Sequence, residues 1–186
     1  MNPFCIVECF QIFEYQSICM PIIVDFKAIR TTRPTGGPDS FCQRIKLLFR
    51  EPLGTGKTYV AACISNALLE RNVTVKMTNF NTIVDTMFRV ENKTEYMNEL
   101  SHCSLLIIDK LGLERSSEYA LGIIFYVIDH RYRSGKPLIT TTNLPLKEIK
   151  GESNINKRRI YDLILERCTP ILVDGENNCE KTSEKT

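Results

Sequence analysis

A glycine-rich turn between an apolar run and an amphipathic run is the feature that most constrains this chain of 186 residues. A mostly apolar run at 45–49 precedes the turn, residues 54–58 read Gly-Thr-Gly-Lys-Thr, and residues 59–71 carry apolar side chains at helical spacing. Glycines let a backbone approach phosphates closely and adopt positive φ angles. A strand, such a turn and then a helix form a P-loop, so the pattern predicts an α/β fold with a phosphate-binding edge.

The turn itself supplies the candidate nucleotide-binding residues. They are Leu53, Gly54, Thr55, Gly56, Lys57 and Thr58. Lys57 would reach the β- and γ-phosphates of a nucleotide, and the hydroxyl of Thr58 would bind Mg²⁺. One position departs from the pattern G-x-x-x-x-G-K-[ST], because Glu51 stands where the first glycine is expected. A carboxylate about 5 Å from a phosphate would weaken binding by roughly 3 kcal/mol at an effective dielectric constant of about 20.

Two polar residues follow buried strands further along the chain. Asp109 ends the apolar run 105–109, where open α/β sheets bind ligands, and it could hold Mg²⁺. Asn143 follows residues 138–142 and could reach the γ-phosphate and its attacking water. The alternatives are that Asp109 only terminates a strand and that Asn143 is an ordinary loop residue.

The remaining pattern alternates strands with helices. We predict further strands at 73–78 and 170–173, and helices at 82–90, 94–100, 117–133 and 157–167. Strands that are apolar on both faces indicate a parallel sheet, here of about five strands, with helices on both faces. We expect three regions: an N-terminal segment and linker at 1–40, a core at 41–174, and a disordered polar tail at 175–186.

Composition excludes few functions. The net charge of +2 neither requires nor excludes nucleic acid. The eight cysteines include no C-x-x-C pair, which argues against a zinc ribbon. We expect Cys63 and Cys103 to be small core residues with reduced thiols, in a cytoplasmic protein. Acidic residues interrupt the apolar stretch 4–26, so neither a signal peptide nor a membrane span is predicted.

The helix predicted at 157–167 carries a basic cluster that includes Arg159. Its arginines could act in trans on a nucleotide held by a neighbouring subunit. A solvated basic helix face is the alternative interpretation.

The order of the motifs resembles the DnaC/DnaI helicase loaders and the IstB-like transposition ATPases, two related AAA+ groups. The resemblance covers roughly residues 45–174 and rests on Gly-Thr-Gly-Lys-Thr, Met-Thr-Asn-Phe at 77–80, Leu-Ile-Ile-Asp at 106–109, Thr-Thr-Asn-Leu at 141–144 and Arg-Ile-Tyr-Asp at 159–162. It implies ATP and Mg²⁺ as cofactors, self-association through the nucleotide sites, and contact with single-stranded DNA and a replicative helicase.

The resemblance also assigns roles to individual residues. It maps Thr58 and Asp109 to the metal site, Asn143 to the sensor and Arg159 to the arginine finger. The candidate catalytic residues are Lys57, Asp109, Asn143 and Arg159. Asn79 and Phe80 fall in the region that contacts single-stranded DNA. Phe80 could stack on a base, although a core position is the favoured interpretation.

Departures from the family pattern predict weak or absent hydrolysis. Besides Glu51, Lys110 replaces the acid that activates water, and Leu163 replaces a second arginine. Four alternatives stay open: a degenerate mobile-element copy that binds no nucleotide, a transposition helper ATPase, another P-loop enzyme such as a small-molecule kinase, and a DNA-binding module. The basic residues of that module would be Arg131, Arg133, Lys157, Arg158 and Arg159.

Overall fold

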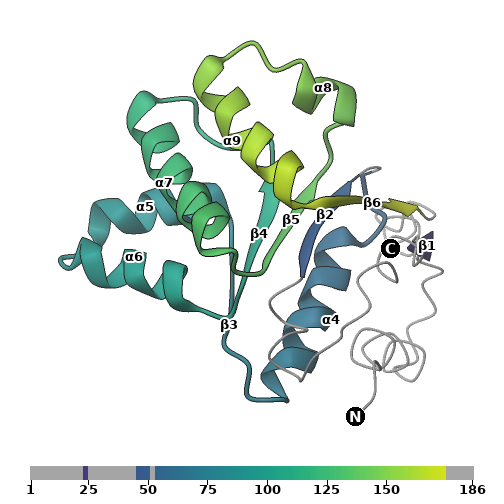
Figure 1. Cartoon of the computed structure of the whole chain (residues 1–186), viewed down its shortest axis with the longest axis horizontal. Helices are drawn as coiled ribbons and strands as arrows, with labels where there is room; N and C mark the ends of the chain where they lie inside the picture. The colour runs from purple at the N-terminus through teal and green to yellow at the C-terminus, as the bar shows by residue number, and fades with distance from the viewer. Residues whose placement is uncertain (1–22, 25–44, 51–52, 175–186) are drawn as a thin grey trace, which may run out of the picture.

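The computed structural model describes residues 23–24, 45–50 and 53–174, which are coloured in Figure 1. Six strands form one sheet in the order β1-β6-β2-β5-β4-β3. Their bounds are β1 (Ile23–Val24), β2 (Lys46–Arg50), β3 (Val75–Thr78), β4 (Leu105–Leu111), β5 (Leu138–Thr142) and β6 (Thr169–Asp174). Strands β2 to β6 pair in parallel, and only the short β1 runs antiparallel, along the edge of β6.

Helices cover both faces of the sheet (Figure 1). Their bounds are α4 (Lys57–Leu69), α5 (Phe80–Arg89), α6 (Lys93–His102), α7 (Glu118–Ser134), α8 (Leu146–Lys150) and α9 (Ile155–Arg167). Alternate residues of a strand point to opposite faces, so Leu105 and Ile107 pack with α4, whereas Leu106 and Ile108 pack with α5, α7 and α9. The prediction of an α/β fold with a five-stranded parallel sheet is confirmed.

Several boundaries differ from those predicted. Helix α4 begins at Lys57, inside the glycine-rich motif, whereas the apolar spacing begins only at residue 59. Gly56 is its N-cap. The pattern also missed β1 and α8, which have two and five residues and are too short for a periodicity to be visible. The rest of the N-terminal segment 1–40 and the tail 175–186 lie outside the described residues.

The cysteine prediction was partly wrong. Cys63 and Cys103 are half-buried, and Cys168 is the buried thiol of the described set. An apolar neighbourhood in the sequence did not ensure burial of either side chain. Cys63 lies on α4, and Cys103 is the C-cap of α6. Burial raises the pKa of the Cys103 thiol despite the neighbouring Arg131 guanidinium, so the thiol stays protonated at neutral pH.

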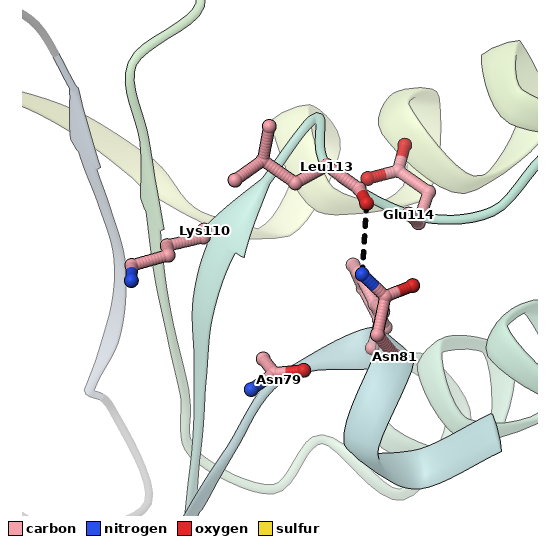
Figure 2. Close-up of a pocket in the computed structure, with 6 residues that line it drawn as sticks. Asn79, Asn81, Lys110, Leu113 and Glu114 are labelled. Atoms are coloured by element: carbon pink, nitrogen blue, oxygen red, sulfur yellow. Dashed lines mark hydrogen bonds between the residues drawn. The ribbon is translucent and has the colours of Figure 1, made fainter. Parts of the chain in front are cut away.

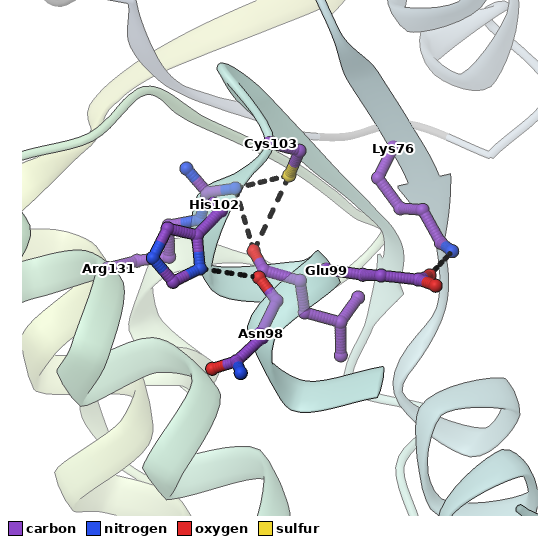
Figure 3. Close-up of polar contacts among 7 residues, drawn as sticks. Lys76, Asn98, Glu99, His102, Cys103 and Arg131 are labelled. Atoms are coloured by element: carbon purple, nitrogen blue, oxygen red, sulfur yellow. Dashed lines mark hydrogen bonds and ion pairs between the residues drawn. The ribbon is translucent and has the colours of Figure 1, made fainter. Parts of the chain in front are cut away.

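Arg131 is a second correction, because it is 2% exposed and unavailable to DNA. Its Nη2 donates to the carbonyl of Leu100 at 2.8 Å and also contacts the Cys103 sulfur (Figure 3). Lys136 donates to the carbonyl of Ser101 at 2.9 Å. Two cations therefore bind the last carbonyls of α6, where the helix dipole favours positive charge. Among the described helices, none is long and apolar enough to cross a membrane.

Candidate nucleotide-binding site

The loop between β2 and α4 has the backbone geometry that its glycines allow. Gly54 and Gly56 have φ angles of 78° and 86°, in the left-handed region that other residues rarely adopt. Gly56 is also the N-cap of α4, so the free N–H groups of that helix begin at the loop. Thr55 and Lys57 are buried, whereas the side chain of Leu53 is exposed. Glu51, the predicted departure in this loop, lies outside the described residues.

The two predicted metal ligands lie next to each other. The Thr58 hydroxyl donates to Asp109 Oδ1 at 2.8 Å, although 51 residues separate them in the sequence. Thr141 donates to the same oxygen at 2.6 Å from the neighbouring strand β5. Hydroxyl and carboxylate oxygens are the ligands that Mg²⁺ prefers, so Thr58 and Asp109 fit a magnesium ion.

Lys110 has an unusual backbone conformation directly after Asp109. Its φ angle is 65°, which typically costs a residue with a side chain about 1–2 kcal/mol. Its N–H donates to Thr141 Oγ1 at 2.9 Å, and the pairing of β4 with β5 shifts register between Ile108 and Leu111. Thr141 thus fixes both Asp109 and the strained residue that follows it.

The other two predicted site residues lie on separate elements. Asn143 is exposed one residue beyond β5, at the sheet edge where β4 also ends. Arg159 is exposed on α9, and within the described part of the chain no hydrogen bond or ion pair holds its side chain. The structure therefore brings Thr58 and Asp109 into contact, sets Asn143 at the same edge, and leaves Arg159 unconstrained.

The sequence model of the IstB-like ATP binding protein family matches residues 40–186. The chain belongs to that family. The IstB-like protein is 33% identical over 121 residues to the replicative helicase loader DnaC of Escherichia coli K12. This alignment covers 61% of this chain and 49% of DnaC. It is 26% identical over 172 residues to a protein of insertion sequence IS232 from Bacillus thuringiensis subsp. berliner, covering 89% of this chain and 64% of that protein.

Solved structures agree on the fold. Crystal structures of DnaI and of the DnaC helicase loader each superpose with a TM-score of 0.64 at 22% identity. They cover 80% of this chain, and 84% and 87% of their own chains respectively. DnaA of Aquifex aeolicus with bound AMPPCP gives a TM-score of 0.59 at 18% identity, over 76% of this chain and 46% of DnaA. The fold is that of AAA+ P-loop NTPases, and the IstB-like protein spans about half the length of the DnaC sequences that it matches.

A small pocket of about 130 Å³ opens beside this site (Figure 2). Its lining residues are Asn79, Phe80, Asn81, Lys110, Leu113 and Glu114. Phe80 is only 2% exposed, so its predicted core position is confirmed. Asn79 caps α5 by accepting the N–H of Thr82 at 2.9 Å. In Figure 2 the Lys110 side chain extends away from both asparagines.

The sequence pattern gave no role to three residues of the site region: Thr141, Glu114 and Tyr161. Thr141 had a visible signal, because a hydroxyl at the end of a buried strand usually has a hydrogen-bond partner. Glu114 and Tyr161 are both buried and bonded to each other. Because 47 residues separate them, no local pattern marks that pair.

Proposed function

We propose that the IstB-like protein binds ATP with Mg²⁺ in the loop before α4 and acts as a nucleotide-gated, helicase-loader-like protein. The observation that supports this most strongly is the 2.8 Å contact between Thr58 and Asp109, two oxygen ligands delivered from separate elements. If Asp109 only ended a strand, nothing would require its partner to be the hydroxyl of the Gly-Lys-Thr motif. The contact therefore favours a working metal site over a degenerate copy.

Each residue of the site would make a different contact with the nucleotide. The backbone N–H groups at Gly54 and Gly56 would surround the phosphates, and Lys57 would pair with the β- and γ-phosphates. Thr58 and Asp109 would hold Mg²⁺, which when bound neutralises phosphate charge. Asn143 would act as the sensor at the γ-phosphate. Arg159 would reach the nucleotide of a neighbouring subunit, because its exposed side chain has no partner among the described residues.

Hydrolysis would be weak or absent. Lys110 stands directly after Asp109, where an acid would be required to activate the attacking water. Its ammonium group cannot accept a proton from that water. The protein would therefore respond to ATP binding rather than to turnover.

The proposed partners are a replicative helicase, single-stranded DNA and further copies of the protein, in the cytoplasm. Similarity to a relative named as a replicative helicase loader supports the first. The exposed residues Arg158 and Arg159 on α9 offer positive charge for the second. Arg133 is a weaker candidate for DNA contact, because it pairs with Asp129 at 2.8 Å.

Co-sedimentation with the replicative helicase of the same genome, with and without ATP and Mg²⁺, tests this function. We expect an association that requires ATP and is lost in Lys57→Ala. Salt-sensitive binding to single-stranded DNA that ignores ATP, with no helicase association, would favour a DNA-binding module instead.

A transposition helper ATPase is the second candidate. It rests on the similarity to the IS232 protein, which extends over 89% of this chain. ATP-dependent association with the transposase of a neighbouring element, and none with the helicase, would favour this candidate.

A further inference from the structure

Glu114 is a buried carboxylate that the proposed function does not use. It is 7% exposed, and within the described residues no cation pairs with it. One carboxylate oxygen accepts the N–H of Gly112 at 2.7 Å, and the other accepts the hydroxyl of Tyr161. Burying a carboxylate is costly unless hydrogen bonds compensate it. This arrangement therefore depends on both donors.

Tyr161 joins Glu114 to the helix that carries the candidate finger. It is 1% exposed and lies on α9 two residues after Arg159. Residues two apart on a helix point to nearly opposite sides, which agrees with a buried Tyr161 and an exposed Arg159. Desolvation, with the bond to Glu114, raises the pKa of Tyr161, so its hydroxyl remains a donor. Any movement of Glu114 would act on α9 at this point.

Hydrogen bonds from β5 and α5 hold the segment between Asp109 and Glu114. Thr141 accepts the N–H of Lys110 at 2.9 Å, and Thr142 donates to the carbonyl of Leu111 at 3.0 Å. Asn81 donates to the carbonyl of Leu113 at 2.9 Å (Figure 2). A displacement at Asp109 would therefore pass along a short, bonded segment to the carboxylate of Glu114.

We propose that Glu114 and Tyr161 form a positioning pair that couples the nucleotide site to the orientation of α9. ATP in the loop would set the Asp109 end of β4, and the pair would hold Arg159 ready for a neighbouring subunit. This inference rests on the proposed function, since it needs ATP binding and ATP-dependent self-association. Glu114 and Tyr161 are positioning residues, because neither belongs to the loop or to the Thr58–Asp109 pair proposed to hold ATP and Mg²⁺.

The test measures two properties of Tyr161→Phe and Glu114→Gln: affinity for a fluorescent ATP analogue, and ATP-dependent self-association by sedimentation velocity. We expect ATP affinity within about threefold of the wild type in both variants. The protein concentration for half-maximal association should rise at least about tenfold, which corresponds to about 1.4 kcal/mol. The double variant should be no worse than the poorer single variant, because the two residues act through one bond.

Tyr132→Phe is the matched control. Tyr132 of α7 donates to Glu166 of α9 at 2.6 Å, so it too is bonded to α9. Within the described residues, it has no hydrogen bond to the segment after Asp109. We expect Tyr132→Phe to associate like the wild type. Equal losses in Tyr132→Phe and Tyr161→Phe would overturn the proposal, since any loosening of α9 would then suffice.

Other outcomes separate the two claims. Normal association in a folded Tyr161→Phe, or in Glu114→Gln if Tyr161→Phe fails to fold, would overturn the positioning pair and leave ATP binding intact. A wild-type protein that binds ATP without associating would also overturn it. A wild-type protein that binds no ATP would refute the proposed function, and the pair would fall with it.

Discussion

Thr141 shows how one hydroxyl organises a polar strand end within an apolar sheet. It donates to Asp109 Oδ1 at 2.6 Å and accepts the N–H of Lys110 at 2.9 Å. The first bond orients the carboxylate toward Thr58, and the second stabilises the left-handed backbone of Lys110. The geometry of the candidate metal site thus depends on a residue that would itself bind neither metal nor phosphate.

Gly112 and Gly122 give opposite predictions for the same substitution. Gly112 has a φ angle of 102°, and a Cβ there would lie 2.5 Å from Leu144 Cδ1. We expect Gly112→Ala to lower the free energy of unfolding by about 2 kcal/mol, from backbone strain and crowding. Gly122 is in the middle of α7, where a Cβ meets nothing within 4 Å. Gly122→Ala should therefore stabilise the protein by about 0.5–1 kcal/mol. Urea unfolding measures both, and equal destabilisation would contradict this account.

Restoring the missing acid should restore turnover. We expect Lys110→Asp, combined with Glu51→Gly, to raise the steady-state ATPase rate by a factor of about 10²–10⁴, the usual contribution of a general base. The measurement is phosphate release in the presence of Mg²⁺ and ATP. As the control, a triple variant that also carries Asp109→Asn should lose the increase in ATPase rate. If the restored protein binds ATP but stays inactive, the cause of weak hydrolysis lies outside these two positions.

At the scale of elements, α9 depends on its N-cap. The side chain of Asn154 accepts the N–H groups of Asn156 at 3.0 Å and Lys157 at 3.1 Å. We expect Asn154→Ala to lower the free energy of unfolding by about 1 kcal/mol, because those N–H groups lose their acceptor. Asn156→Ala, an exposed change in the same turn, should have an effect below about 0.5 kcal/mol. Thermal unfolding compares the two, and similar values would argue against the cap.

The long elements could be predicted because their periods are strong. Strand β5 was predicted with its observed bounds, and α7 ends within one residue of its predicted end, at the left-handed C-cap Gly135. The short elements could not be predicted, since β1 and α8 depend on partners rather than on their own pattern. Exposure within helices was also hard to predict: Phe125 has helical spacing with the core residues but is 38% exposed.

At the scale of the molecule, the parallel order β6-β2-β5-β4-β3 brings the carboxyl ends of β2, β4 and β5 to one edge. That edge could be predicted, because each polar motif followed a buried strand in the sequence. The bond between Glu114 and Tyr161 could not, since it depends on how α9 packs over the sheet. Local patterns therefore predicted Thr58 and Asp109, which the structure brings into contact, but not the residues that support them.

Binding of a fluorescent ATP analogue to the purified protein with Mg²⁺ tests the central claim most directly. The proposed site predicts micromolar binding that weakens at least about tenfold, or about 1.4 kcal/mol, in Lys57→Ala. The exposed Lys93 at the start of α6 offers a matched control, and Lys93→Ala should bind like the wild type. Absence of binding in the wild type, or equal binding in Lys57→Ala, would contradict the claim that this loop holds ATP.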